Sequence, residues 1–253
     1  MGTALVTGAS AGLGEEYCWQ LAEAGHDVVL VARREDKLTA LAHDLEQIGG
    51  VNAEVLVSDL GIQQGRDAVA QRLRDEKKPI GLLVNNAGFG RGRPFLDGDF
   101  SEELYGLDVM VRAVMELSHA AGTAMVGRGR GAILNVSSVA SDTGMGTYSA
   151  HKAWVKAFSE GLAEELRGTG VTVTAVMPGM VNTGFHDRTA VDVSQIAPVS
   201  WITAEQVVTE SLAAVRRGQV LVTPSVRYKL TSTVVKYAPR WAVRAVTRRI
   251  PHM

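Results

Sequence analysis

Short runs of apolar residues alternate along the chain with longer segments in which apolar positions recur every three or four residues. The first pattern is typical of strands buried on both faces, and the second of amphipathic helices. Seven runs read as buried strands: Thr3–Thr7, Asp27–Ala32, Ala53–Val57, Ile80–Val84, Gly131–Val136, Val171–Val176 and Gln219–Thr223. The alternation predicts repeated strand–helix units and a parallel sheet covered on both faces.

Helical periodicity fills most of the intervals between these strands. The predicted helices span Gly12–Ala24, Asp36–Ile48, Gly65–Glu76, Ser101–Val126, Thr147–Arg167 and Ala204–Arg217. Two segments break the rhythm, a loop-rich region at 178–202 and a basic C-terminal helical tail at 225–253. Because no Pro, Gly or Ser-rich linker divides the chain, we expect residues 1–253 to form a single domain. Its fold class is α/β, a three-layer doubly wound Rossmann fold with a seven-stranded, mainly parallel sheet.

Composition narrows the functional classes only slightly. Hydrophobic residues make up 46% and charged residues 21% of the 253 residues, the balance of an ordinary globular protein rather than a disordered chain or a membrane span. The formal net charge of −1 gives no reason to expect nucleic acid as a partner. Cys18 is the only cysteine, so an intrachain disulfide is impossible. The N-terminus also lacks the pattern of a signal peptide, and we expect a cytoplasmic protein.

A glycine-rich turn follows the first predicted strand. Residues 7–14 read Thr-Gly-Ala-Ser-Ala-Gly-Leu-Gly and lead straight into a helix. Glycines let the backbone approach a pyrophosphate, whose charge is then held by N–H groups at the helix N-terminus. An ordinary flexible turn is the alternative, but the string stands at the strand-to-helix junction that dinucleotide binding requires. The predicted cofactor contacts here are Gly8, Ser10, Gly12, Leu13 and Gly14.

The end of the second strand indicates which dinucleotide binds. An acidic residue about 20 residues after the glycines would accept a hydrogen bond from the ribose of NAD, whereas arginine accommodates a 2′-phosphate. Arg33 and Arg34 occupy this place. They favour NADP(H) over NAD(H), unless both are merely solvated side chains at a strand end.

Several further motifs occur in a fixed order, and together they resemble those of the short-chain dehydrogenase/reductase family. They are the spacing Thr-Gly-x-x-x-Gly-x-Gly from Thr7, Asn85-Asn86-Ala87-Gly88, Ser137-Ser138, Tyr148-Ser149-Ala150-His151-Lys152 and Pro178-Gly179-x-Val181-x-Thr183. The resemblance extends from residue 3 to about residue 224. It implies further cofactor contacts at Asp59, Leu60, Asn86, Ala87, Gly88, Tyr148, Lys152, Pro178, Gly179, Val181 and Thr183. It implies no metal ion.

Tyr148 and Lys152 are the candidate catalytic pair. Their spacing of four residues places both side chains on one face of the predicted helix. A phenol has a pKa near 10, and a neighbouring ammonium would lower this pKa towards the range where proton transfer is efficient. Taken alone, such a pair is usually a surface tyrosine beside a lysine. Ser138 at the end of the fifth strand strengthens the catalytic interpretation, because sites in α/β sheets form at the carboxyl ends of strands.

The resemblance also implies roles for these residues. Ser138 rather than Ser137 would face the substrate, although either hydroxyl could be buried and satisfied by backbone. In reduction, Tyr148 would protonate the carbonyl oxygen while hydride arrives from the nicotinamide, and Lys152 would bind the nicotinamide ribose. Oxidation of an alcohol would reverse these steps. The cofactor itself carries the hydride chemistry.

The sequence departs from the family pattern at two places. Met110 stands where the family commonly has an asparagine that helps to hold a water beside the lysine, and a thioether cannot replace an amide in a proton relay. Backbone carbonyls or Asp108 could hold the water instead, or the relay is weaker. Nine residues separate Ser138 from Tyr148, a short loop that should open one edge of the cleft. His151 is expected on the helix surface rather than as a base.

The segment at 178–202 covers the substrate in the resembling family, and here it is mostly apolar. Its apolar residues are Met180, Val181, Phe185, Val191, Val193, Ile196, Val199, Trp201 and Ile202. Phe89, Phe95, Met145 and Trp154 could contribute as well. We expect a small apolar carbonyl or alcohol substrate with one reacting oxygen, although core packing would explain many of these residues equally well.

The C-terminal tail is strongly basic. No acidic residue follows Glu210, whereas Lys236, Arg240, Arg244 and Arg248 recur every four residues and would form a stripe on one helix. Contact with an anionic membrane surface is one interpretation. We favour the other, in which the helix packs its apolar side over the cleft or a partner subunit and leaves its arginines in water.

The sequence thus predicts an NADP(H)-dependent oxidoreductase acting on an apolar ketone, aldehyde or secondary alcohol. A non-catalytic NADP(H)-binding sensor is the alternative, motivated by Met110 and the short loop. The family resemblance also implies a homodimer or homotetramer.

Overall fold

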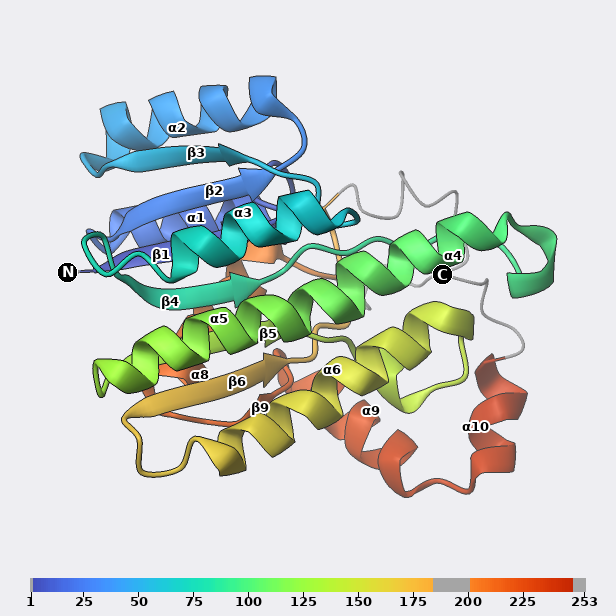
Figure 1. Ribbon diagram of the computed structural model, residues 1–253. Coiled ribbons are helices and arrows are strands. Elements are labelled where there is room, and N and C mark those ends of the chain that lie inside the picture. The colour runs from blue at the N-terminus through green and yellow to red at the C-terminus, as the bar shows by residue number, and fades with distance from the viewer. Residues whose placement is uncertain (1, 184–200, 248–253) are drawn as a thin grey trace.

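A computed structural model describes residues 2–183 and 201–247 as an α/β protein of three layers (Figure 1). Within these ranges a seven-stranded sheet has the strand order β3-β2-β1-β4-β5-β6-β9. Every neighbouring pair in it is parallel. The strands are β1 (Thr3–Thr7), β2 (Asp27–Ala32), β3 (Ala53–Val57), β4 (Ile80–Asn85), β5 (Gly131–Val136), β6 (Val171–Val176) and β9 (Leu221–Val222). The predicted doubly wound Rossmann sheet is confirmed.

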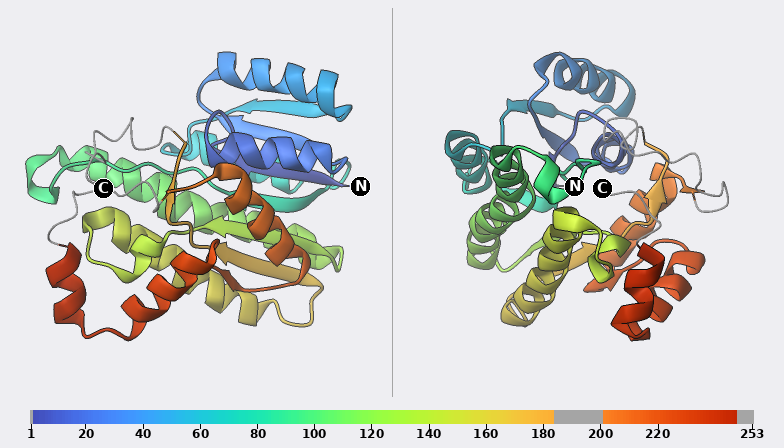
Figure 2. Two further views of the ribbon diagram at one scale, coloured as in Figure 1. Left: turned by 180° about the vertical axis from the view of Figure 1, so that it is seen from behind. Right: turned by 90° about the vertical axis from the view of Figure 1, so that its right-hand side faces the viewer.

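Helices cover both faces of the sheet, as Figures 1 and 2 show from opposite sides. One face carries α1 (Leu13–Glu23), α2 (Glu35–Gly49) and α8 (Ala204–Arg216), and the other carries α3 (Gln63–Leu73), α5 (Ala113–Gly127) and α6 (Gly146–Glu165). Alternate residues of β1 pack into opposite layers: Ala4 and Val6 join the first core, and Leu5 joins the second. This two-sided burial explains the unbroken apolar runs of the strands.

The predicted helix Ser101–Val126 is a rod interrupted by one wider turn. It begins as α4 (Phe100–Leu107), where the side chain of Asp99 accepts a hydrogen bond from the backbone N–H of Ser101. A π-helical turn at Asp108–Arg112 follows, and α5 continues from Ala113. A π-turn inserts one extra residue and leaves no compositional mark, so apolar periodicity could not reveal it.

The C-terminal tail forms two helices rather than one. They are α9 (Val226–Tyr237) and α10 (Arg240–Thr247). Pro239 separates them, because proline lacks a backbone N–H and keeps the residue before it extended; Ala238 has φ −67° and ψ 143°. The expectation of one basic stripe on one helix is therefore wrong. Lys236 lies in α9, Arg240 and Arg244 lie in α10, and Arg248 falls outside the described residues.

The carboxyl ends of the strands meet at the right-hand edge of the sheet in Figure 1. The loops after β1, β2, β4 and β5 converge there, together with the two-stranded parallel sheet of β7 (Met180–Val181) and β8 (Trp201–Ile202). Helices α9 and α10 lie outside this edge. Across residues 2–183 and 201–247, no helix is both long enough and apolar enough to span a bilayer.

Candidate active site

A cavity of about 920 Å³ opens at the carboxyl edge of the sheet. It brings together nearly every residue that the sequence singled out, from segments up to 175 positions apart: Gly8, Ser10, Gly12, Leu13, Arg33, Arg34, Asp59, Leu60, Asn86, Ala87, Gly88, Ser138, Tyr148, Lys152, Pro178, Gly179, Val181 and Thr183. Gly14 belongs to the same turn as Gly12 but does not line the cavity. The motifs therefore form one continuous site.

The glycine-rich turn passes so close to its own helix that side chains are excluded. Gly8 has a φ of +69°, which disfavours any residue with a Cβ. A Cβ on Gly14 would lie 2.1 Å from the carbonyl oxygen of Gly8. Asn86 ties the turn to the end of β4, because its amide Nδ2 donates to the Thr7 carbonyl oxygen at 2.9 Å. The resulting backbone cradle fits the pyrophosphate of a dinucleotide.

Two exposed arginines stand at one end of the cavity. Arg34 Nη2 donates to the carbonyl oxygen of Ser10 at 2.9 Å and to its Oγ at 3.0 Å. Arg33 Nη1 donates to the hydroxyl of Tyr105 at 2.8 Å, and that hydroxyl donates to Asp59 Oδ1 at 2.7 Å. Two guanidinium groups and the Ser10 hydroxyl thus line the same cavity as the cradle, and guanidinium groups are suited to bind a phosphate.

Sequence reasoning missed Tyr105. This residue lies on α4, far in sequence from Arg33 and Asp59, and no local pattern distinguishes it from an ordinary helix residue. Its ring lies 5.9 Å from the Arg33 guanidinium. Burial and the hydrogen bond with Asp59 raise the pKa of its hydroxyl, so Tyr105 stays neutral while it holds both side chains.

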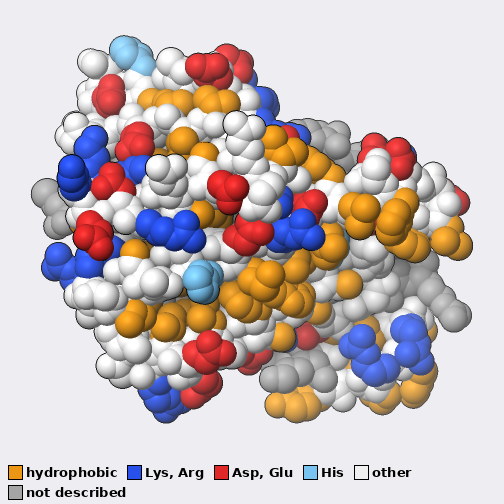
Figure 3. Space-filling model, in the orientation of Figure 1, with side chains coloured by type: hydrophobic (Ala, Val, Ile, Leu, Met, Phe, Trp, Pro, Cys, Tyr) orange, Lys and Arg blue, Asp and Glu red, His pale blue; other side chains and the backbone are white. Residues whose placement is uncertain are grey.

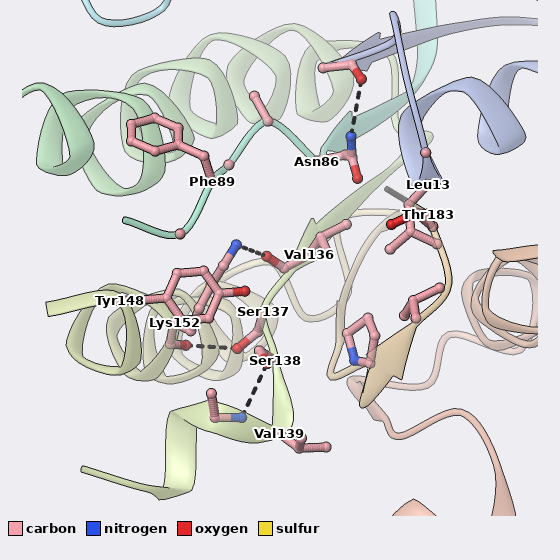
Figure 4. A pocket seen from close by; sticks show the side chains of 18 of the residues that line it. Leu13, Asn86, Phe89, Val136, Ser137, Ser138, Val139, Tyr148, Lys152 and Thr183 are labelled. Atoms are coloured by element: carbon pink, nitrogen blue, oxygen red, sulfur yellow. Dashed lines mark hydrogen bonds between the residues drawn. The ribbon is translucent and has the colours of Figure 1, made fainter. Parts of the chain in front are cut away.

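The candidate catalytic residues meet at the centre of the cavity (Figure 4). The Nζ of Lys152 donates to the Val136 carbonyl oxygen at 2.8 Å, which anchors α6 to the end of β5. Ser138 Oγ accepts a hydrogen bond from the backbone N–H of Ala140 at 3.1 Å, and the Ser138 side chain also acts on Tyr148, whose pKa it lowers. Ser137 turns the other way and donates to the Lys152 carbonyl oxygen at 2.7 Å.

Burial controls the protonation of this pair. It raises the pKa of Tyr148 to about 12, although the hydrogen bond with Ser138 opposes the shift, and it lowers the pKa of Lys152 to about 8. The expectation that Lys152 would bring the tyrosine pKa below its ordinary value is therefore wrong, because the phenolate would lose its hydration. At neutral pH Tyr148 is a protonated phenol and thus a proton donor.

Met110 lies near Lys152, beside Gly88. A Cβ added to Gly88 would lie 3.4 Å from Lys152 Nζ and 3.5 Å from Met110 Sδ, so both side chains border the same point. Met110 is buried in the π-helical turn. Asp108, the proposed substitute for the missing amide, forms an ion pair with Arg112 at 2.9 Å.

His151 is buried, which contradicts its expected place on the helix surface. Burial lowers its pKa, although the carboxylate of Glu103 raises it and the charge of Lys152 lowers it further. Its Nδ1 has no hydrogen-bond partner in the described part of the chain. Glu103 instead accepts a hydrogen bond from Thr147 Oγ1 at 2.7 Å. Among the residues that the structure describes, no group of three or more His, Cys, Asp or Glu could hold a metal ion.

The C-terminal helices form one wall of the cavity. The sequence did not predict which of their residues line it. The Tyr228 ring of α9 covers Gly179, where a Cβ would lie 2.1 Å from the ring. The Tyr228 hydroxyl also accepts a hydrogen bond from the backbone N–H of Met180 at 2.9 Å. Farther along, the wall consists of Thr231, Ser232, Val234, Val235, Ala238, Ala242 and Val243. The expected packing of the tail over the cleft is thus observed.

The apolar residues proposed for the substrate pocket divide into three groups. Phe89, Met145, Met180 and Val181 line the cavity. Phe95 is half exposed, Trp154 stacks on Phe158 with ring centroids 4.7 Å apart, and Trp201 and Ile202 form β8, so these four do not belong to the described lining. The third group, Phe185, Val191, Val193, Ile196 and Val199, lies outside the described residues.

Comparison with known sequences places this arrangement among oxidoreductases. Residues 2–194 match the family model described as short chain dehydrogenase. Over 186 residues, 72% of the chain, it is 36% identical to sulfoacetaldehyde reductase 2 of Chromohalobacter salexigens, and the match covers 73% of that protein. Over 189 residues, 71% of the chain, it is 35% identical to the very-long-chain 3-oxoacyl-CoA reductase of Anas platyrhynchos, of which the match covers 60%.

Solved structures give the same result over nearly the whole chain. A short-chain dehydrogenase from Sphingobium yanoikuyae in complex with NADPH is 33% identical, with a TM-score of 0.85 and a match that covers 92% of this chain and 93% of the other. The bulky-bulky ketone specific alcohol dehydrogenase from Comamonas testosteroni is 30% identical, with a TM-score of 0.81 and coverage of 92% of both chains.

Proposed function

The chain belongs to the short-chain dehydrogenase family, and from this premise we propose that it is an NADP(H)-dependent reductase or dehydrogenase of an apolar ketone, aldehyde or secondary alcohol. The observation that carries the proposal is the convergence of Ser138, Tyr148 and Lys152 in one cavity with the glycine cradle. The Ser138 side chain lowers the pKa of Tyr148, and two neighbouring hydroxyls of this kind could bind one substrate oxygen together.

In the reduction direction, each side chain has a separate role. The bound nicotinamide supplies the hydride. Ser138 donates a hydrogen bond that orients the carbonyl oxygen, and Tyr148 transfers its phenolic proton to the same oxygen. The raised pKa of Tyr148 suits this direction, because the proton is present at neutral pH. Lys152, held by the Val136 carbonyl oxygen, binds the nicotinamide ribose.

The preference for NADP(H) rests on Arg33, Arg34 and Ser10. Their donors line the cavity and would bind a ribose 2′-phosphate, because a phosphate accepts charge-assisted hydrogen bonds from guanidinium groups. The related Sphingobium yanoikuyae protein was solved with NADPH, which is consistent with this assignment. The other contacts proposed for the cofactor are Gly8, Gly12, Leu13, Gly14, Asp59, Leu60, Asn86, Ala87, Gly88, Tyr148, Lys152, Pro178, Gly179, Val181 and Thr183.

The substrate class follows from the surroundings of Tyr148. Phe89 and Met145 pack in one apolar cluster with Tyr148, and Val235 and Val243 of the C-terminal helices line the same cavity, whereas the exposed arginines follow β2. An apolar body with one reacting oxygen fits such a lining better than a charged substrate does. The relatives include a ketone-specific alcohol dehydrogenase and a very-long-chain 3-oxoacyl-CoA reductase, which supports a bulky apolar substrate.

Assembly and location belong to the same proposal. Exposed apolar side chains gather on α4 and α5, at Leu104, Leu107 and Met115, and they suit burial in a homodimer or homotetramer. The protein is proposed to work in the cytoplasm, where its single buried thiol, Cys18, stays reduced.

The test is oxidation of NADPH and of NADH with a panel of hydrophobic ketones and aldehydes, comparing the natural protein with Tyr148→Phe. We expect turnover with NADPH that falls by a factor of roughly 100 or more in the variant, since the general acid is lost. Cofactor binding, followed by fluorescence, should remain. If the natural protein binds NADPH but oxidises it no faster than Tyr148→Phe on any substrate, the proposal fails and cofactor sensing would explain the site.

A further inference from the structure

Helix α9 carries apolar residues on two sides, and only one of these sides packs against the rest of the protein. Tyr228, Ser232 and Val235 face inward and line the cavity. On the other side Val226, Leu230, Val234 and Tyr237 recur at intervals of three or four residues and are 66% to 78% exposed. This spacing aligns them along one side of the helix. Val234 lies at the edge of this side and also borders the mouth of the cavity. We call these four residues the outer stripe.

Trp241 extends the apolar surface onto α10. Its side chain is 70% exposed, whereas Val243 of the same helix is buried against the cavity wall. Two consecutive helices therefore both cover the cleft from outside and present large apolar side chains to solvent. Packing over the cleft accounts for the inner sides of these helices and leaves the outer stripe and Trp241 unexplained.

Basic residues border this apolar surface. On α9, Arg227 and Lys229 lie on either side of the outer stripe, and on α10 Arg240 and Arg244 share the exposed side with Trp241. Figure 3 shows Lys and Arg side chains next to hydrophobic ones over this lower right part of the molecule. The neighbouring carboxylate of Asp142 is neutralised by Lys156 at 2.8 Å.

The charge of the tail contrasts with that of the rest of the chain. Residues 225–253 contain seven Lys and Arg residues and no Asp or Glu, a net charge of +7. Residues 1–224 contain 19 basic and 27 acidic residues, a net charge of −8. An anionic surface would therefore attract this end of the molecule and orient it.

We propose that α9 and α10 dock on the surface of an anionic lipid bilayer. An amphipathic helix with apolar and aromatic residues between basic ones is the pattern that lies in the headgroup region, with its apolar side among the acyl chains. A second copy of this chain is a poorer occupant, because pairing through this surface would bring two strongly basic segments together. Since the same helices form the cavity wall, the docked face is continuous with the proposed substrate cleft.

Flotation with lipid vesicles tests the proposal, with phosphatidylglycerol-containing phosphatidylcholine vesicles compared with pure phosphatidylcholine. We expect binding only to the anionic vesicles, weakening as salt is added. Lys229→Gln should lower the partition coefficient about fivefold, the effect of one basic residue at such a surface. Leu230→Gln should lower it roughly tenfold or more, because the leucine no longer enters the apolar layer.

Matched variants elsewhere provide the controls. Ile48→Gln on α2 changes an equally exposed apolar residue, and Arg216→Gln on α8 removes an exposed basic one; both should bind like the natural protein. Because every altered residue is exposed, NADPH binding should persist in all four variants and report folding. The measurement involves no turnover, so its outcome is separate from that of the proposed reductase activity.

Two results would overturn the proposal. One is equal, weak flotation with anionic and neutral vesicles at low salt. The other is a Leu230→Gln variant that floats as well as Ile48→Gln. If that variant also has a smaller molar mass in solution than the natural protein, the outer stripe is an interface between copies instead.

Discussion

The Nζ of Lys152 lies 5.7 Å from the centroid of the Tyr148 ring, and both side chains are buried. Burial moves the two pKa values apart: that of Lys152 falls to about 8 and that of Tyr148 rises to about 12. Between these values the uncharged forms of both groups prevail. Burial therefore favours the protonated phenol of Tyr148 over its phenolate.

The buried lysine makes stability depend on pH. Its pKa is 10.5 in the unfolded chain and about 8 in the folded protein, so the unfolded chain binds more protons between these values. Stability should consequently rise with pH across this window. Relative to Lys152→Met, the natural protein should gain about 3 kcal/mol in free energy of unfolding from pH 8 to pH 10.5. Urea unfolding of both proteins across this range measures the difference, and titrations common to both cancel. A difference independent of pH would show that Lys152 is well solvated.

The thioether of Met110 should not take part in proton transfer. It borders the same point as Lys152 Nζ, but sulfur is only a weak acceptor. Met110→Leu should therefore keep kcat within about twofold of the natural value and cost less than about 1.5 kcal/mol in stability. Steady-state kinetics and thermal unfolding check this. A much larger loss of kcat, without a matching loss of stability, would show that the sulfur acts in the reaction.

Discrimination between the two cofactors should depend on the paired arginines. Arg33→Ala and Arg34→Ala should each raise the Kd of NADPH by roughly tenfold to a hundredfold, since each removes charge-assisted hydrogen bonds to the 2′-phosphate. NADH serves as the internal control, because it lacks that phosphate and its Kd should barely change. Fluorescence titration measures both constants. Equal losses for NADPH and NADH would mean that the arginines bind a part shared by the two cofactors.

Contact between α9 and the loop at Gly179 can be tested by a double-mutant cycle. A Cβ at residue 179 would lie 2.1 Å from the Tyr228 ring, so Gly179→Ala should displace that ring and weaken NADPH binding by tenfold or more, roughly the cost of overpacking a well-packed site. In a Tyr228→Ala background the same substitution should cost much less. The Kd of NADPH in the four proteins measures the coupling. Strictly additive effects would contradict the close approach of Gly179 and Tyr228.

Local patterns in the sequence predicted the parts of the site that depend on local structure. The glycine turn, Arg33 and the Tyr148–Lys152 pair each lie at a strand end or on one helix face, where spacing alone determines position. The parallel sheet then brings these segments to the same edge, as the seven apolar runs predicted.

Tertiary contacts decided what the sequence could not show. Tyr105 and Tyr228 reach the cavity from helices whose docking has no local signature. The burial of His151 follows from α4 packing beside α6, and the sign of the Tyr148 pKa shift depends on the depth of the cavity. The break at Pro239 could have been predicted, because proline seldom continues a helix.

The ring of Tyr228 packs over Gly179, so a movement of α9 would also move the loop that contains Gly179. Any ligand that holds α9 in its present place would also hold the backbone at Gly179 and Met180. Thermodynamic reciprocity then requires that NADPH strengthen attachment at α9 by the same factor by which attachment strengthens NADPH binding. Through one aromatic side chain, occupancy of the cofactor site and attachment at α9 would each strengthen the other.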